Sequence, residues 1–204
     1  MNLSFVIVSF KSFHLIEKHL QEIDTRHQII IIENSLDIKL KERLEKVYSN
    51  VEVIIPAGNL GYGKALNLGI EKSKNNFVFC MVADLNVKKE CFFQIETIIN
   101  EFSNFSILAP TYSDETVHKN YAIFNNNNNN IKKVLHFILK EVDEIDGAIL
   151  IVNKSKFNTY NIMDENIFLY FESTDLCLRL RKDNHKLYVI ENLKFEHFGL
   201  KSSH

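Results

Sequence analysis

The chain has 204 residues, of which 46% are hydrophobic, 25% charged and 11% aromatic. This length predicts one domain with a sizeable core, and the apolar content excludes a disordered chain. Because 24 Lys and Arg side chains are balanced by 26 Asp and Glu, for a net charge of −2, there is no global basic field and we expect no nucleic-acid partner.

The three cysteines, Cys80, Cys91 and Cys177, lie outside any CxxC spacing. Their odd number and wide separation argue against a disulfide framework or a zinc site. The segment Met1–Phe10 lacks the basic start and cleavage site of a signal peptide. The longest apolar run, Phe77–Ala83, is far shorter than the roughly 18 residues of a membrane-spanning helix. We therefore expect a cytoplasmic protein.

Short apolar runs alternate with amphipathic stretches through the first half of the chain. The runs typical of strands are Leu3–Ser9, Gln28–Ile32, Val51–Ile55, Phe77–Val82 and Phe105–Ala109. The stretches with helical spacing of apolar residues are Ser12–Asp24, Leu36–Tyr48, Lys64–Lys74 and Lys88–Phe102. Apolar strands separated by helices predict an α/β fold of the nucleotide-binding type, with a mainly parallel central sheet covered on both faces.

The second half is less regular. The strand candidates are Glu144–Val152, Lys186–Ile190 and Leu193–Glu196, and Glu172–Lys182 is predicted to be a helix. Six consecutive asparagines, Asn125–Asn130, indicate a loop. Since the chain shows no internal repeat and no linker, residues 1–204 are predicted to form a single domain.

A glycine-rich segment, residues 58–69 with the sequence GNLGYGKALNLG, separates the third predicted strand from the third predicted helix. Glycines at such a place allow a tight turn close to a ligand, and the following helix N-terminus favours an anion. The dinucleotide pattern GxGxxG fails because Leu66 occupies its last glycine position. The P-loop pattern GxxxxGK[ST] matches through Lys64, but Ala65 replaces the hydroxyl that binds magnesium. A tight turn without a ligand is the third interpretation.

Six short motifs follow one another along the chain. They are Glu33-Asn34-Ser35, Asn59-x-Gly61-x-Gly63-x-x-x-Asn67-x-Gly69, Asp84-Leu85-Asn86, Asp146-Gly147, Phe171-Glu172-Ser173-Thr174-Asp175 and His197-x-Gly199. In this order and spacing they resemble the family-2 glycosyltransferases of the inverting, GT-A-fold type, especially their rhamnosyltransferase-like branch, from Leu3 to about Ser203. The resemblance implies a GT-A domain whose residues 1–110 bind a nucleotide-sugar and whose residues 111–204 supply the acceptor site and the catalytic groups.

An enzyme of this kind transfers a sugar from a UDP- or dTDP-sugar to a hydroxyl of a glycan or a lipid-linked acceptor. The resemblance places that reaction in the synthesis of a surface polysaccharide. A lipid-linked acceptor would bring the protein to the inner face of the membrane without a spanning segment.

The resemblance also assigns donor-binding residues. Ser9 and Glu33, at the ends of the first two predicted strands, would face the base or the ribose. Asp146 and Gly147 would line the pocket for the donor sugar and the acceptor. The glycine-rich segment would lie against the nucleotide through Asn59, Gly61, Gly63, Lys64 and Asn67.

Asp84 and Asn86 match the metal motif of the family, which is usually Asp-x-Asp or Asn-x-Asp. Acid and amide are exchanged here, so that one carboxylate remains, and Asp84 would also contact the donor diphosphate. His197 resembles the histidine of a segment that closes over the diphosphate and can ligate the metal. Because one carboxylate with substrate phosphates is a normal arrangement for Mg²⁺, we expect Mg²⁺ or Mn²⁺ at Asp84, Asn86 and His197.

The resemblance makes Glu172 the general base and has Asp175 orient it or contact the acceptor. Their spacing of three residues would put both carboxylates on one helix face. The family usually has an acid at the position of Ser173, and a serine there cannot replace it as a base. Arg179, one turn further on, is placed to pair with Asp175.

Simpler structural interpretations stay open at each place. Asn34 or Ser35 could cap the following helix, and Lys64 could be a solvated surface lysine. The Asp84 motif could be a turn that ends a strand, and the acidic pair of the predicted helix could complement the helix dipole.

Two other functions also stay open. Ser173, the single carboxylate of the Asp84 motif and the short chain are compatible with a catalytically weakened or partner-dependent nucleotide-sugar-binding protein. A P-loop phosphotransferase is the rival enzyme.

Overall fold

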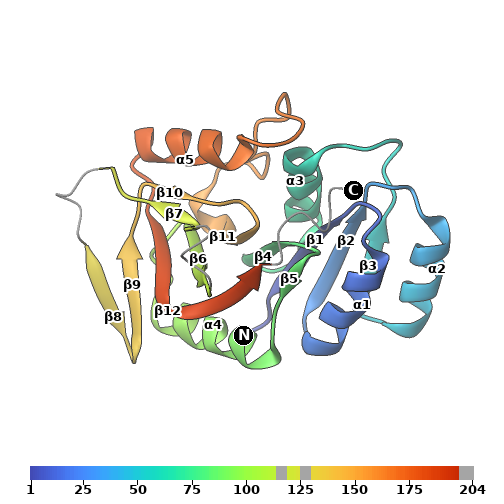
Figure 1. Ribbon diagram of the computed structural model, residues 1–204, viewed down its shortest axis with the longest axis horizontal. Coiled ribbons are helices and arrows are strands. Elements are labelled where there is room, and N and C mark those ends of the chain that lie inside the picture. Colours follow the sequence, from blue (N-terminus) through green and yellow to red (C-terminus); the bar gives the residue numbers. More distant parts are fainter. Residues whose placement is uncertain (114–118, 125–129, 198–204) are drawn as a thin grey trace.

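The computed structural model describes residues 1–113, 119–124 and 130–197, and it shows a central sheet with helices on both faces (Figure 1). The helices are α1 (Phe13–Glu22), α2 (Ile38–Val47), α3 (Tyr62–Lys72), α4 (Lys89–Glu101), a 3₁₀ turn η1 (Lys154–Lys156) and α5 (Glu172–Lys182). The strands of the first half are β1 (Ser4–Ser9), β2 (Gln28–Glu33), β3 (Val51–Ile54), β4 (Phe77–Val82), β5 (Leu85–Asn86) and β6 (Ile107–Tyr112). Those of the second half are β7 (Tyr121–Ala122), β8 (Ile131–Val134), β9 (Phe137–Glu141), β10 (Glu144–Ile145), β11 (Ile149–Asn153) and β12 (Leu187–His197).

The first half forms the parallel part of the sheet, as predicted. Strands lie in the order β3-β2-β1-β4, and each neighbouring pair is parallel, with Ser9 beside Glu33 at the ends of β1 and β2. These strands are apolar along most of their length because helices cover both of their faces. The carboxyl ends of β1, β2 and β4 therefore meet at one edge of the sheet.

The second half makes the sheet mixed. Strand β11 lies antiparallel between β4 and β6, β12 runs parallel to β6, and the hairpin β8–β9 extends the sheet beyond β12. One sheet thus runs through both halves of the chain.

Several element boundaries of the second half differ from the prediction. The predicted strand Glu144–Val152 is two strands, because Asp146 forms a turn in which its Oδ1 accepts a hydrogen bond from the Ala148 N–H. The two predicted strands near the end join into β12, whose pairing shifts between Ile190 and Lys194. The sequence did not predict β8 and β9. Of the predicted asparagine loop, residues 125–129 lie outside the described part.

Side chains that alternate along the strands build two apolar layers. Phe5 and Ile7 point into the layer covered by α1, α2 and α4, whereas Val6 points into the layer covered by α3 and α5. The same alternation holds in β2 and β4. Gly69 in α3 lets this helix approach β1, since a Cβ there would lie 2.2 Å from Val6 Cγ1. The polar strand ends are left at the edge of these layers.

Candidate functional site

A cavity of about 760 Å³ lies at the carboxyl ends of β1 and β4. Asn34, Asn59 and Asp84 line it from the first half of the chain, and Asp146 and Glu172 from the second. Its size is that of a small-molecule site, and open α/β sheets bind their ligands at this edge.

The loop before α3 is held in place by two asparagines. Asn34 Nδ2 donates to the Gly61 carbonyl over 3.1 Å, and Asn34 Oδ1 accepts from the Leu60 N–H over 3.3 Å. Asn59 Oδ1 accepts from the Gly61 N–H over 2.9 Å. Asn34 therefore positions the loop and does not cap α2, whose N-cap is Asp37.

Gly61 is required by the backbone at this point. Its φ of +75° and ψ of −175° belong to a backbone region that residues other than glycine rarely adopt. A Cβ at this position would lie 2.1 Å from the Phe168 carbonyl oxygen. The neighbouring Tyr62 N–H donates to that oxygen over 3.1 Å. The loop thus packs directly on the segment that precedes α5.

Three further residues of the glycine-rich segment were predicted to bind the donor: Gly63, Lys64 and Asn67. They belong to α3 and lie outside the cavity lining. Gly63 allows close packing, since a Cβ would lie 3.1 Å from Met163 Cβ. Lys64 Nζ lies 3.4 Å from a Glu165 carboxylate oxygen. Asn67 Nδ2 donates to the Met163 carbonyl over 3.0 Å, and its Oδ1 accepts from the Met163 N–H over 2.9 Å. These contacts fix the loop after η1, and a lysine engaged in this way gives no support to the P-loop interpretation.

Ser9 and Glu33 are buried behind the cavity lining. The Ser9 carbonyl accepts from the Asn34 N–H over 2.8 Å. Glu33 Oε1 accepts from the Ser35 N–H over 2.8 Å and also from the Ser35 hydroxyl. In this structure both residues order the turn that carries Asn34.

Of the three predicted metal ligands, the structure places Asp84 on the cavity, where it is 2% exposed. Asn86 lies in β5 and is engaged elsewhere, because its Oδ1 accepts from Lys18 Nζ over 3.0 Å and its Nδ2 donates to Glu196. The side chain of His197 lies outside the described part. Within the described ranges no three His, Cys, Asp or Glu side chains gather closely enough to bind a metal.

Glu172 is the first residue of α5 and lines the cavity. It is buried, and its Oε2 atom has no hydrogen-bond partner among the described residues. Burial raises the pKa of its carboxyl, and the nearby charge of Asp146 raises it further. Such a carboxyl can accept a proton from a ligand hydroxyl near neutral pH.

Asp175 is not among the residues that line the cavity. Its Oδ2 lies 2.6 Å from Arg179 Nη2, as the sequence suggested, and Arg179 Nη2 also donates to the Ile162 carbonyl over 2.8 Å. The role of Asp175 in orienting Glu172 or contacting the acceptor therefore stays a prediction, and the described contacts engage its carboxylate with Arg179.

The cavity has an acidic wall and a largely apolar rim. Four carboxylates line it, against one ammonium among the described residues, that of Lys119; the acids are Asp84, Glu144, Asp146 and Glu172. Tyr62 OH donates to the Gly147 carbonyl over 2.6 Å and so joins the two halves of the wall. The rim carries the exposed segment 168–171, with the sequence FLYF.

Residues 4–157, more than half of the chain, match the family model described as Glycosyl transferase family 2. The chain belongs to glycosyl transferase family 2. A curated relative, the low-salt glycan biosynthesis hexosyltransferase Agl10 of Haloferax volcanii, is 24% identical over 199 residues, which cover 90% of this chain and 62% of that protein. The dTDP-rhamnosyl transferase RfbF of Shigella flexneri is 24% identical over 178 residues, covering 83% of this chain and 59% of that protein. The chain thus spans about three fifths of the length of these relatives.

Solved structures of glycosyltransferases share the fold. GalNAc-T7 with UDP, GalNAc and Mn²⁺ superimposes with a TM-score of 0.74 at 13% identity, over 97% of this chain and 44% of that one. The mannosyltransferase PcManGT of Pyrobaculum calidifontis, in complex with GDP-Man and Mn²⁺, gives 0.71 at 8% identity, over 98% of this chain and 58% of that one. These likenesses confirm the predicted GT-A fold. No helix in the described part of this family-2 chain is long and apolar enough to cross a membrane.

Proposed function

We propose that this family-2 protein is an inverting glycosyltransferase that transfers a sugar from a UDP- or dTDP-sugar to a hydroxyl group of a glycan or lipid-linked acceptor, with Glu172 as the general base. The observation that carries the proposal is a buried carboxyl with a raised pKa and an oxygen atom without a partner, at the wall of a ligand-sized cavity.

The chemistry assigned to Glu172 is removal of a proton from the acceptor hydroxyl as that oxygen attacks the anomeric carbon. The bond from this carbon to the diphosphate oxygen breaks in the same displacement, so that the configuration inverts and the nucleoside diphosphate leaves. The adjacent Ser173 cannot take the role of base, because a serine hydroxyl is not basic at neutral pH. Asp175 contributes indirectly, through its ion pair with Arg179 at the first turns of α5.

The donor diphosphate needs a cation in this cavity, because four carboxylates already line it. Asp84 is the described residue that would hold Mg²⁺ or Mn²⁺ there, and one carboxylate together with substrate phosphates suits either ion. The bound ion would neutralise the charge of the leaving diphosphate. Asn86 and His197 stay proposals as further ligands, as do Ser9, Glu33, Gly63, Lys64 and Asn67 as donor-binding residues.

The named relatives support the substrate class. One is named for hexosyl transfer in glycan biosynthesis and the other for dTDP-rhamnosyl transfer. We extend this to the present chain as synthesis of a surface polysaccharide in the cytoplasm, at the inner face of the membrane when the acceptor is linked to a lipid.

The test is a thermal-shift panel of UDP, dTDP, GDP, ADP and ATP, each with and without Mn²⁺. A ligand at 100 times its Kd stabilises the folded protein by about 2.7 kcal/mol, which such a panel detects. We expect a manganese-dependent rise in Tm with UDP or dTDP. Asp84→Asn should abolish that rise, whereas the control Asp24→Asn, at a partly exposed position outside the cavity lining, should keep it.

Other outcomes of the panel contradict the proposal in different ways. A shift with ATP alone would indicate a phosphotransferase. A shift with UDP or dTDP without any transfer or hydrolysis of a nucleotide-sugar would indicate a nucleotide-sugar-binding protein.

A further inference from the structure

We propose that Asn120 is a specificity-determining residue whose side-chain oxygen accepts a hydrogen bond from a hydroxyl group of the donor sugar. This inference rests on the proposed function, because it concerns the sugar that the same cavity would hold. No residue near position 120 belongs to the motifs that the sequence singled out.

Asn120 is a buried polar residue on the cavity wall. It lines the cavity just before β7 and is 1% exposed. Its Oδ1 atom has no hydrogen-bond partner among the described residues. An unpaired buried acceptor destabilises the folded protein, so a ligand that donates a hydrogen bond to this atom recovers that cost.

The orientation of the Asn120 amide is fixed by its other end. Nδ2 donates to the Pro110 carbonyl over 2.8 Å, and rotating the amide by 180° would place two oxygen atoms against each other. The atom left for the ligand is therefore an acceptor. It selects a hydroxyl or N–H group and disfavours a methyl group or an ether oxygen.

Asn120 lies beside the place that the reaction requires for the sugar. In an inverting displacement the anomeric carbon lies between the leaving diphosphate, assigned to Asp84, and the base Glu172. The Asn120 carbonyl accepts from the Asp146 N–H over 2.8 Å, and Asp146 is close enough to Glu172 to raise the pKa of its carboxyl. Asn120 and Glu172 both line this cavity, and each carries a buried side-chain oxygen without a hydrogen-bond partner among the described residues.

The experiment measures the Kd of free nucleotide and nucleotide-sugar by calorimetry, in the presence of Mn²⁺. The probes are UDP, dTDP, UDP-glucose, UDP-galactose, UDP-N-acetylglucosamine and dTDP-rhamnose. We expect the wild-type protein to prefer one sugar by at least about tenfold, since a site built around a hydroxyl rejects sugars that lack it. In Asn120→Leu, affinity for that sugar should fall by about 5- to 100-fold while affinity for the free nucleotide changes less than about twofold.

Matched variants separate recognition from folding. Asn153 is also buried, but both ends of its amide are bonded and it lies outside the cavity lining, so Asn153→Leu should lower Tm and keep the sugar preference. If Asn120→Leu does not fold, Asn120→Ser serves in its place, because its shorter side chain removes the amide oxygen without adding bulk.

The two proposals fail in different ways. Loss of affinity for the nucleotide and all sugars to the same degree, or an unchanged preference in the Asn120 variants, would overturn the role of Asn120 alone. A wild-type protein without any sugar preference would do the same. Absence of UDP and dTDP binding in the wild-type protein would overturn the proposed function, and the role of Asn120 with it.

Discussion

At the scale of single residues, Glu172 is the proposed general base, and burial of its carboxyl group lowers the stability of the folded protein. Its raised pKa means that the folded protein holds the proton more tightly than the unfolded chain does. The stabilisation that this provides is complete below the unfolded pKa of about 4.3 and is lost as the pH rises through the folded value. Above the folded pKa the carboxylate is charged and buried with one oxygen unpaired, which makes the native state less stable than a neutral side chain would.

Glu172→Gln is therefore expected to raise Tm at pH 7 while it lowers transfer by about 10²-fold or more, because the amide cannot accept the proton. Tm is read by calorimetry and turnover by release of UDP or dTDP. The acid limb of kcat/KM in the wild-type protein should lie above the ordinary glutamate pKa of about 4.3. Glu52→Gln, at an exposed position, is the matched control and should change neither quantity. Unchanged turnover in Glu172→Gln would remove this residue from the role of base.

Residues that line the cavity were predictable where they belong to a family motif, as for Asp84, Asp146 and Glu172. Asn34 and Asn120 contribute through single side-chain amides whose partners, Gly61 and Pro110, come from other segments. Such pairings depend on the folded sheet: the sequence suggested a helix cap for Asn34 and gave no sign of a role for Asn120. The sequence did predict the pairing of Asp175 with Arg179, but not that the same guanidinium also donates to the Ile162 carbonyl.

At the scale of elements, the contact between the loop before α3 and the segment before α5 shapes the cavity. Gly61→Ala would put a Cβ on the Phe168 carbonyl at a backbone conformation that costs alanine about 1–3 kcal/mol. We expect a lower Tm and a loss of UDP or dTDP affinity, measured by calorimetry. Gly58→Ala is the control, since no atom lies within 4 Å of the position that its Cβ would take and its φ is not positive, so both quantities should stay unchanged. Equal behaviour of the two variants would mean that the loop tolerates displacement from Phe168.

Helices and strands were predicted best where the pattern of apolar residues in the sequence is regular. In the first half, Phe77–Val82 has the same bounds in the prediction and in β4, because a continuous buried run has one interpretation in a parallel sheet. In the second half, the hairpin β8–β9 has the sequences IKKV and FILKE, and the first three residues of IKKV are exposed, so that its apolar pattern is weak. Its outer strand lies at the edge of the sheet, where burial constrains the sequence least.

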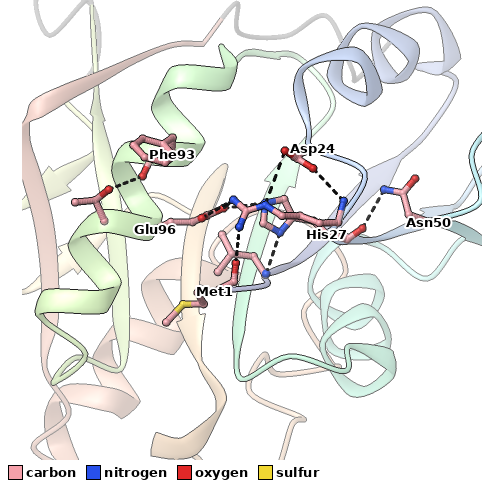
Figure 2. A network of polar contacts seen from close by, with 9 residues as sticks. Met1, Asp24, His27, Asn50, Phe93 and Glu96 are labelled. Atoms are coloured by element: carbon pink, nitrogen blue, oxygen red, sulfur yellow. Dashed lines mark hydrogen bonds and ion pairs between the residues drawn. The ribbon is translucent and has the colours of Figure 1, made fainter.

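At the scale of the whole molecule, a partly buried polar network ties the start of the chain to α4 (Figure 2). His27 Nδ1 accepts from the Leu3 N–H over 3.1 Å, and His27 Nε2 lies 2.8 Å from a Glu96 carboxylate oxygen. Arg26 Nη2 lies 2.6 Å from both oxygens of the same carboxylate. Because Nδ1 must accept from a backbone N–H, the network requires the neutral imidazole with its proton on Nε2.

This requirement gives the fold a predictable dependence on pH. Burial lowers the pKa of His27 more than the nearby Glu96 raises it, and burial also lowers the pKa of His19. Since the folded protein binds these protons less tightly than the unfolded chain, the stabilisation is complete above the unfolded pKa of about 6.5 and is lost as the pH falls below it. We expect Tm to decrease from pH 7.5 to pH 5.5, a window above the range in which most carboxylates titrate. In His27→Gln that decrease should be smaller, whereas His14→Gln, at an exposed position, should retain it. A Tm that rises over this window, or an unchanged slope in His27→Gln, would contradict the neutral-imidazole network.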